Sequence, residues 1–287
     1  MTQPRADASR PLVIKLGGLA VDSPERAGPL LAAIARIHRA AQPGVVLVHG
    51  GGKAVDEHLA KLSIQTERRE GLRVTGDREI GEVVAVLAGK VNKAVVGALQ
   101  AAGAAAVGLC LGDGQMTRAQ RYAPSGVDLG HVGEVVGGDP RLLRILLAEG
   151  FMPVVGPIAL DDSGRPLNVN ADDAAAAVAG IIRARGLVLL TDVPGVLDEQ
   201  RALIPSLTAA QVDELIARGV ISGGMIPKVR AALRAAQLAA VPTIIASWDD
   251  PAAIERIAAG SGAGTRFDPL GPTSDPDAEP RPESSPS

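Results

Sequence analysis

Short apolar runs that stop at glycines alternate with segments of helical periodicity along most of this 287-residue chain. Residues 12–16 run into Gly17 and Gly18, and residues 45–48 run into His49 and three further glycines. Strands that alternate with helices pair in parallel, because each helical crossover brings the chain back to the same end of the sheet. The pattern therefore predicts an α/β fold with a mainly parallel sheet.

The remaining elements are predicted from the same two periods. Further strands are expected over residues 104–109, 152–155, 187–190 and 243–246, and a β-hairpin rich in glycine and valine is expected over 125–138. Apolar spacing predicts helices near 30–37, 55–62 and 142–147, and one long helix over 80–101. Thr208 followed by Gln211 is a capping-box pattern, and Pro227 suits the first position of another helix.

Composition divides the chain into four parts. Residues 1–10 are polar and are expected to be flexible, and two lobes are expected over 11–184 and 185–267. After Phe267 the chain contains almost no apolar residues, so burial cannot offset the entropy lost on ordering. Residues 268–287 are therefore predicted to form a disordered tail.

Composition also excludes several classes of protein. The chain has few aromatic residues, two Phe, one Tyr and one Trp, and a net charge of −3, unlike proteins that stack bases or bind nucleic acid through a basic surface. The single cysteine, Cys110, excludes an internal disulfide and fits a reducing compartment. The sequence shows neither an apolar run of about 18 residues nor a secretory signal. We expect a cytoplasmic protein without a nucleic-acid or membrane partner.

Two glycine clusters, at residues 17–18 and 50–52, could hold an anion. Glycine lets backbone N–H groups approach a ligand closely, and the helix expected after the second cluster adds a favourable dipole. Each cluster taken alone is better explained by a tight turn between strand and helix. Neither fits a standard nucleotide fingerprint, because Leu47 and Ala54 break the P-loop pattern and no G-x-G-x-x-G is present.

Charged and polar residues near the glycines are further candidates. Lys15 lies inside an apolar strand, where a charge is costly without an anionic partner. Lys228 lies in the first turn of a helix, where a cation opposes the helix dipole. Arg73 could bind a carboxylate through two parallel hydrogen bonds, although an ordinary surface arginine explains it better when it is taken alone. Asn168 and Asp172 have the character of ordinary capping residues, yet they could reach the same crevice.

Metal binding and covalent catalysis have little support in the sequence. The four histidines show no metal-ligand spacing with Cys110, and we expect them to be structural or exposed: His38, His49, His58 and His131. Cys110 lies in an apolar strand, which is typical of a core residue. The sequence contains no G-x-S-x-G motif. No metal site built by the protein alone is predicted.

Six short segments carry most of these candidates, and any one of them would be weak by itself. They are Lys15-Leu16-Gly17-Gly18, His49-Gly50-Gly51-Gly52, Gly71-Leu72-Arg73-Val74-Thr75, Asn168-Val169-Asn170-Ala171-Asp172, Leu190-Thr191-Asp192-Val193 and Gly223-Gly224-Met225-Ile226-Pro227-Lys228-Val229. In content and order they resemble the motifs of the amino-acid kinase family, and the resemblance covers residues 11–267.

The resemblance implies a three-layer αβα sandwich whose first lobe binds N-acetyl-L-glutamate and whose second lobe binds ATP. It implies transfer of the γ-phosphoryl group to the side-chain carboxylate, giving N-acetyl-L-glutamyl 5-phosphate in arginine biosynthesis. The catalytic roles fall to Lys15, Lys228 and Asp172, with Asp172 organising both lysines. The implied substrate contacts are Gly51, Gly52, Arg73 and Asn168. The implied nucleotide contacts are Gly17, Gly18, Asp192, Val193, Gly195, Val196, Leu197 and Ser222.

Such a reaction suits the residues present. A carboxylate of pKa about 4.3 is ionised at neutral pH, so the nucleophile needs no general base. The difficulty lies in bringing two anions together, and lysines, backbone N–H groups and Mg²⁺ relieve it. Mg²⁺ needs few protein ligands when phosphates and water supply most of its shell. ATP and Mg²⁺ are therefore the expected cofactors.

Two local departures and a short N-terminus point to one branch of the family. Gly76 precedes Asp77 where other members have aspartate directly after Arg-Val-Thr, and Ala246-Ser247-Trp248 replaces an Asp-Gly-Arg turn. Both variants resemble the short, arginine-insensitive, dimeric branch. Residues 1–10 would span only about 15 Å as a helix and have no apolar stripe for a hexamer contact. We expect a homodimer whose interface uses the helix over 80–101.

Two alternatives stay open. Another amino-acid kinase, acting on a carrier-linked aminoadipate or a different acid, would carry similar motifs. A ligand sensor without activity could use the same fold, because a fold does not fix a function. The presence of both Lys15 and Lys228 argues against a sensor, which has no need of cations that stabilise a transition state.

Overall fold

The structure is a computed structural model of the whole chain, and it describes residues 9–17, 26–40, 43–69, 71–124 and 127–269. Most of the predicted flexible N-terminus and of the predicted tail, residues 1–8 and 270–287, lies outside the described residues, as does Gly18. Among the described residues, no helix is both long enough and apolar enough to cross a bilayer.

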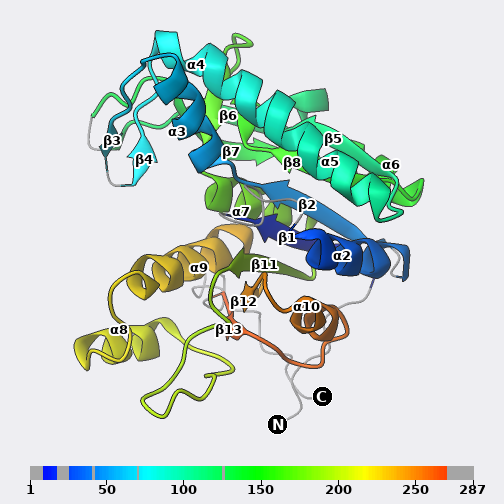
Figure 1. Cartoon of the computed structure of the whole chain (residues 1–287), viewed down its shortest axis with the longest axis vertical. Coiled ribbons are helices and arrows are strands. Elements are labelled where there is room, and N and C mark those ends of the chain that lie inside the picture. The colour runs from blue at the N-terminus through cyan, green and yellow to red at the C-terminus, as the bar shows by residue number, and fades with distance from the viewer. Residues whose placement is uncertain (1–8, 18–25, 41–42, 70, 125–126, 270–287) are drawn as a thin grey trace, which may run out of the picture.

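A seven-stranded sheet forms the middle layer of the molecule (Figure 1). Its central strand, β1 (Leu12–Leu16), pairs in parallel with β11 (Gly186–Thr191) on one side and with β2 (Val45–His49) on the other. Only the edge strand β13 runs antiparallel to its neighbour, β12. The prediction of a mainly parallel sheet is confirmed. The outer strands are β8 (Met152–Gly156) and β5 (Ala106–Cys110) beyond β2, and β12 (Thr243–Ser247) and β13 (Thr265–Phe267) beyond β11.

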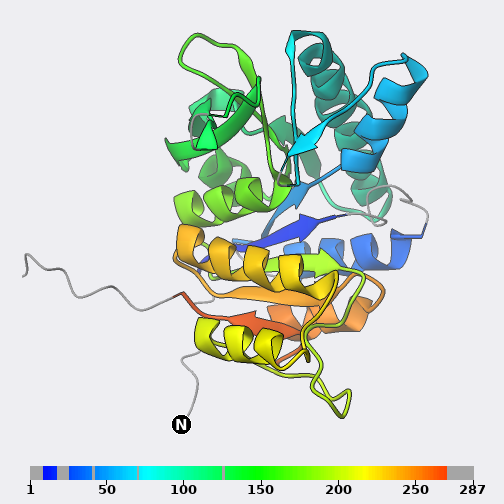
Figure 2. The ribbon, with the colours of Figure 1, turned by 90° about the vertical axis from the view of Figure 1, so that its left-hand side faces the viewer.

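Helices cover both faces of this sheet, because its central strands are apolar on both sides. On β1, Ile14 and Leu16 belong to one buried cluster and Val13 to the other, as expected when side chains alternate along a strand. One face carries α2 (Gly28–Ala40), α3 (Gly52–Lys61), α4 (Asp77–Val84), α5 (Asn92–Ala101) and α10 (Pro251–Ala258). The other carries α6 (Arg141–Ala148), α7 (Ala171–Ile182), α8 (Ala209–Ala217) and α9 (Met225–Ala239). Figure 2 shows α7 and α9 side by side, and the three layers match the expected sandwich.

The predicted hairpin over 125–138 is wrong in its first arm. Among the residues of that range that the structure describes, only β7 (Val132–Gly138) is a strand, and it pairs antiparallel with β6 (Thr117–Arg121), which precedes the range. β6 has the sequence TRAQR, which carries no apolar signal because most of its side chains are polar. β7 and β6 belong to a four-stranded sheet with β10 (Pro166–Val169) and β9 (Ile158–Leu160), and a separate two-stranded sheet pairs β3 (Arg68–Arg69) with β4 (Leu72–Arg73).

The predicted helix over 80–101 begins earlier, at Asp77, and is interrupted. Between α4 and α5 lies a π-helical segment, η1 (Ala85–Val91). Such segments insert an extra residue per turn and are frequent at functional sites.

Helix starts in the second half of the chain are partly as predicted. The capping box of Thr208 and Gln211 is present at α8. Pro227, however, occupies the third position of α9 rather than the first, because the helix already begins at Met225. Proline is tolerated there, since the N–H groups of a first helical turn have no partner within the helix.

Candidate functional site

The candidate site lies where the strand order of the main sheet reverses. The chain moves from β1 to β2 on one side and later returns to pair β11 on the other side of β1. Ligands of open α/β sheets bind outside the carboxyl ends of the strands at such a reversal. The strand ends at this point are followed by Gly17, Gly50 and Asp192, so the two predicted glycine clusters do come together.

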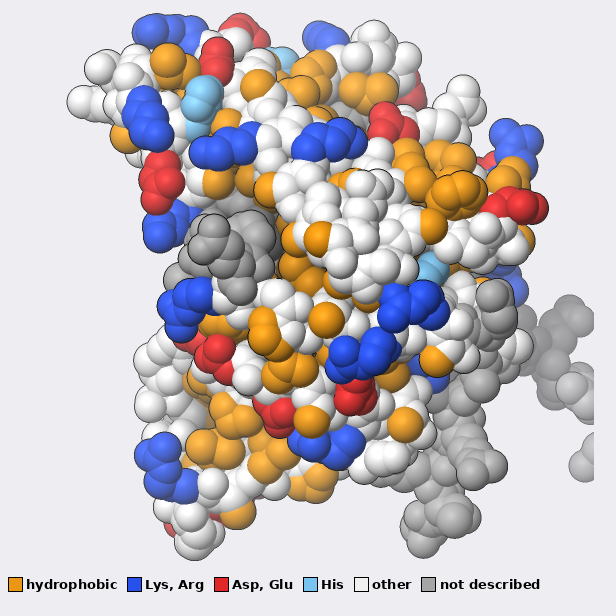
Figure 3. Space-filling view, turned by 45° about the vertical axis from the view of Figure 1, so that its right-hand side comes forward, with side chains coloured by type: hydrophobic (Ala, Val, Ile, Leu, Met, Phe, Trp, Pro, Cys, Tyr) orange, Lys and Arg blue, Asp and Glu red, His pale blue; other side chains and the backbone are white. Residues whose placement is uncertain are grey.

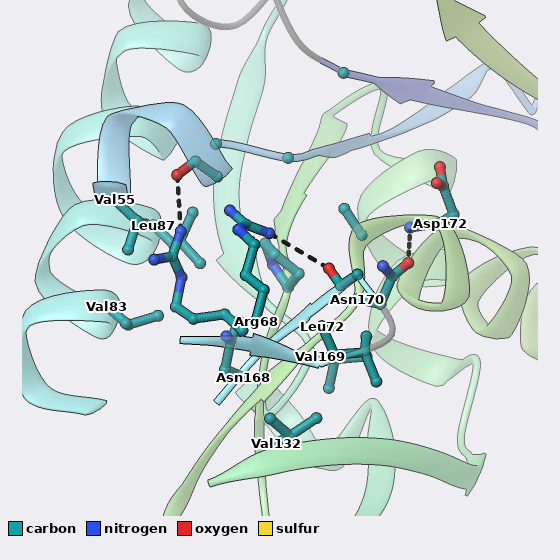
Figure 4. A pocket seen from close by; sticks show the side chains of 18 of the residues that line it. Val55, Arg68, Leu72, Val83, Leu87, Val132, Asn168, Val169, Asn170 and Asp172 are labelled. Carbon is teal, nitrogen blue, oxygen red and sulfur yellow. Dashed lines mark hydrogen bonds between the residues drawn. The ribbon is translucent and has the colours of Figure 1, made fainter. Parts of the chain in front are cut away.

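A first cavity of about 230 Å³ lies on the β2 side of this point (Figure 4). Its wall includes Gly51 and Gly52 at the start of α3, Asn168 on β10 and Arg73 on β4. All four residues predicted to contact the acidic substrate therefore line one cavity. The N–H groups at the start of α3 lack helical acceptors, and Gly51 does not cap them with a side chain.

Two arginines of this cavity share one carboxylate. The Arg73 side chain is only 5% exposed, and its Nη1 lies 2.5 Å from Oδ1 of Asp56 without the alignment of a hydrogen bond. Its Nη2 donates to the Gly52 carbonyl at 3.0 Å. Arg68 Nη2 donates to the other Asp56 oxygen at 2.9 Å. Burial raises the pKa of the Asp56 carboxyl, but the two guanidiniums outweigh burial and hold it below its usual value. An anion entering here meets one carboxylate and two cations.

Sequence reasoning missed Arg68 and Asp56. Arg68 stands in the charged run Glu67-Arg68-Arg69, which is typical of a solvated surface, and Asp56 stands on the polar side of a helix. The one sequence feature that could have indicated Asp56 is its position four residues after Gly52, because residues four apart on a helix lie on the same face.

Asn168 is fixed to the segment that carries Arg73. Its Nδ2 donates to Thr75 Oγ1 at 3.2 Å, and the Thr75 hydroxyl in turn donates to the Arg73 carbonyl at 3.0 Å. The next polar residue, Asn170, caps α7 by accepting hydrogen bonds from the N–H groups of Asp172 and Asp173. The predicted capping role is therefore filled by Asn170, which leaves Asn168 facing the cavity.

A second cavity of about 360 Å³ lies on the β11 side. Lys228 and Asp192 line it and form an ion pair, and Lys228 holds the pKa of the Asp192 carboxyl below its usual value. Trp248 forms an apolar part of the wall, with the Arg26 guanidinium 5.7 Å from the centre of its ring. Gly17, another predicted nucleotide contact, also lines this cavity, and Gly18 lies outside the described residues. The remaining predicted nucleotide contacts line neither cavity: Val193, Gly195, Val196, Leu197 and Ser222.

The two cavities meet at Lys15, Gly17 and Asp172, which line both. Lys15 points from β1 toward the first turn of α7, where its Nζ lies 2.9 Å from Asp172 Oδ1. The side chain of Lys15 is only 15% exposed, and Asp172 is the anionic partner that was expected for a lysine inside an apolar strand. Lys228 pairs with Asp192 at the end of β11, and the expectation that Asp172 also organises Lys228 stays a prediction.

We expect Gly17→Ala to lower kcat while leaving the fold intact. A Cβ at Gly17 would lie 2.6 Å from Lys15 Nζ, so the amine has to move away from the meeting point of the cavities. Misplacing a reacting or stabilising group by about 1 Å can cost roughly 10² in rate. Steady-state kinetics and thermal unfolding measure the two effects. Gly97→Ala on α5 is the control, because a Cβ there meets open space. An unchanged kcat in Gly17→Ala would contradict this placement of Lys15.

Cys110 and the histidines do not form a metal or nucleophile site. Cys110 ends β5 half-buried rather than in the core, and burial raises the pKa of its thiol to about 11, so it is protonated at neutral pH. His38 is buried against backbone groups, and His58 pairs with Glu82. Within the described ranges, no group of three metal-binding side chains is found.

Two cavities that meet at Lys15, with a second lysine lining one of them, suit a phosphotransferase that acts on small molecules. The chain belongs to the amino acid kinase family, which it matches over residues 10–247. It is thus a kinase, and the resemblance drawn from the six segments is confirmed at the level of the family.

Relatives and solved structures agree with this assignment. The acetylglutamate kinase of Vibrio cholerae serotype O1 is 46% identical over 259 residues, which cover 90% of this chain and 97% of the relative. That of Actinobacillus succinogenes is 43% identical over 91% of this chain and 100% of its own length. The structure of smu.665 from Streptococcus mutans UA159 superposes with a TM-score of 0.70 at 28% identity, covering 90% of this chain and 98% of that one. The N-acetylglutamate synthase of Neisseria gonorrhoeae has the same fold, with a TM-score of 0.76 at 22% identity over 91% of this chain and 60% of that one.

Proposed function

We propose that this chain transfers the γ-phosphoryl group of ATP to the side-chain carboxylate of N-acetyl-L-glutamate, forming N-acetyl-L-glutamyl 5-phosphate in arginine biosynthesis. The observation that carries the proposal is the junction of the two cavities at Lys15 and Asp172. An acidic substrate in one cavity and a nucleotide in the other would meet there. Two relatives with 46% and 43% identity are acetylglutamate kinases, which supports N-acetyl-L-glutamate as the acidic substrate.

The residues of the first cavity provide recognition and charge stabilisation rather than proton transfer. Arg73 and Asn168 would bind the α-carboxylate and the acetylated amino group, with Arg73 offering a buried donor that lacks an aligned partner. The backbone N–H groups of Gly51 and Gly52 would face the transferred phosphoryl group, as oxyanion-binding groups do. The nucleophilic carboxylate is ionised at neutral pH, so no base is required.

The residues of the second cavity would hold the nucleotide. Lys15 and Lys228 would approach the transferred group from its two sides, and Asp172 would orient Lys15. We assign the acidic substrate to residues 11–184 and the nucleotide to 185–267. Nucleotide contacts from the β1 and β11 loops and from α9 remain part of the proposal: Gly17, Gly18, Asp192, Val193, Gly195, Val196, Leu197 and Ser222.

Mg²⁺ would accompany the nucleotide. Asp172 and Asp192 contribute carboxylate oxygens, the hard ligands that Mg²⁺ prefers, and their lysine pairs are made through Oδ1 alone. These residues fit an ion that takes most of its shell from phosphates and water. Mg²⁺ supplies charge neutralisation on the phosphates when it is bound. The described residues offer no cage for it without the nucleotide.

A substrate panel tests the proposal. ADP release, measured with ATP and Mg²⁺, is expected with N-acetyl-L-glutamate and not with glutamate, aspartate or carbamate. Release with another acid alone would assign the chain a different substrate within the family. The absence of release with every acid would favour a ligand sensor.

We propose further that the protein is a cytoplasmic homodimer that arginine does not inhibit. The predicted interface over 80–101 stays part of this proposal, and the larger apolar side chains of that segment are mostly buried within the chain. Ile145 on α6 and Phe151 after it are also exposed, at 55% and 40%. Figure 3 shows the right-hand face of Figure 1 turned forward, with hydrophobic side chains between lysines and arginines.

Light scattering together with an arginine titration of the activity tests this assembly. We expect the mass of a dimer and an unchanged rate, since two-fold symmetric dimers are the commonest assembly. A hexameric mass, or inhibition by sub-millimolar arginine, would contradict the proposed branch of the family.

A further inference from the structure

His49 is a completely buried polar residue that the proposed chemistry does not use. It ends β2 and directly precedes the glycines that line the first cavity. Its Nδ1 lies 2.7 Å from the carbonyl oxygen of Gly50, and its Nε2 lies 3.1 Å from Nδ2 of Asn92. A buried imidazole with both nitrogens engaged is held in one orientation.

The partners of His49 define which nitrogen carries the proton. A carbonyl oxygen only accepts hydrogen bonds, so Nδ1 donates to Gly50. The amide nitrogen of Asn92 also lies 3.0 Å from the Val154 carbonyl and 3.3 Å from the Leu109 carbonyl, so that end of the amide is the donor. An amide nitrogen cannot accept a hydrogen bond, so His49 Nε2 does not donate to Asn92 and carries no proton. Burial also lowers the pKa of His49, in keeping with a neutral ring.

The π-helical segment brings Asn92 to this position. η1 ends at Val91, and Asn92 is the next residue, at the start of α5. Leu87 and Val91 of the same segment lie against Gly51, where a Cβ would come 2.8 Å from Leu87 Cδ2. The π-helical segment and the residue after it thus contact both parts of this turn: Leu87 and Val91 lie against Gly51, and Asn92 lies against His49.

We infer that His49 is a positioning residue that fixes the peptide between Gly50 and Gly51. The C=O and N–H of a trans peptide point in opposite directions, so a carbonyl held by His49 turns the Gly51 N–H away from the ring. Gly51 has φ of 147°, a backbone conformation that favours glycine, so the orientation of the peptide before it matters to the turn. The inference rests on the proposed function, in which this N–H faces the transferred phosphoryl group.

The opposite orientation of this peptide would oppose the reaction. A flip would turn the Gly50 carbonyl, the negative end of the dipole, toward the oxygen atoms of the phosphoryl group. Loss of one donor of this kind costs about 10² to 10³ in rate, and a reversed dipole adds repulsion. Asn92 prevents the flip indirectly, because it keeps the proton of His49 on Nδ1.

Two substitutions of His49 separate this role from a merely structural one. Asparagine places its amide nitrogen near the position of Nδ1, whereas the longer glutamine places its amide near Nε2. We expect H49Q to lower kcat by about 100-fold and H49N by less than about 10-fold, with similar melting temperatures. His38→Gln is the control, because His38 is also buried and bonded to backbone but lines neither cavity. Equal losses of kcat in H49Q and H49N would overturn the inference.

Nitrogen NMR of the wild-type imidazole gives a readout that does not depend on activity. We expect His49 to be neutral with its proton on Nδ1, and a proton on Nε2 would overturn the inference even if H49Q failed to fold. Failure of the proposed function is distinguishable from this result. Wild-type protein that releases no ADP with N-acetyl-L-glutamate would refute that function, whereas wild-type activity with a proton on Nε2 would refute only the role of His49.

Discussion

Replacement of Lys228 by alanine is expected to lower kcat by about 10² to 10³ and to change the KM for N-acetyl-L-glutamate little. Lys228 lines the second cavity and not the first, so its ammonium group would act on charge that develops on the transferred phosphoryl group. Removing one preorganised donor to such charge has an effect of this size. The Asp192 side chain left behind is 65% exposed, so water can replace its partner and the fold is not endangered.

The matched control is Arg230→Ala. Arg230 lies on the same helix and pairs with Asp213, away from both cavities, with its side chain 52% exposed. Steady-state kinetics should show a near-normal kcat for this variant. An unchanged kcat in Lys228→Ala would mean that Lys228 only pairs with Asp192, and an increase in KM alone would make it a ground-state contact.

Replacement of Arg73 by lysine is expected to raise the KM for N-acetyl-L-glutamate by about 10- to 100-fold and to leave nucleotide binding nearly intact. Lysine keeps the charge but loses the planar fork, and hydrogen bonds to charged groups are worth about 1.5–3 kcal/mol. Arg73 is buried in the first cavity, where it already contacts Asp56 and the Gly52 carbonyl. A lysine there can make only part of these contacts together with a substrate carboxylate.

Separate titrations of the two ligands measure this effect. Arg69→Lys serves as the control, because Arg69 lies on the same small hairpin but is half-exposed and pairs with Glu67. A loss of ATP affinity equal to the loss for N-acetyl-L-glutamate would place Arg73 in the wrong half of the site.

Elements with a strong apolar signal were predicted well from the sequence. β1 and β2 follow the predicted runs to within one residue, because a strand buried on both faces is almost wholly apolar. β6 was missed, since it lies in a smaller sheet and most of its side chains are polar. η1 was missed because the hydrophobic spacing of 80–101 does not distinguish an α-helix from one with an inserted π-turn.

The residues of the candidate site also divide into those that the sequence indicated and those that it did not. Lys15 was found because a lysine inside an apolar strand requires an explanation, and the structure supplies one in Asp172. Arg68 and Asp56 were missed because charged residues in a charged run give no sign of facing a cavity. The pairing of Lys228 with Asp192 was not predicted, since it depends on how α9 approaches the end of β11.

The sequence by itself determined the parallel sheet, the glycines at its strand ends and the set of charged residues near them, because local periodicity and backbone freedom are encoded over a few residues. The membership in the kinase family followed from the order of the motifs. Only the tertiary structure decided which charges pair, where the two cavities meet and which way the His49 ring faces. Those features depend on contacts between segments as distant as Arg73 and Asn168, whose relative positions are set by the packing of whole elements.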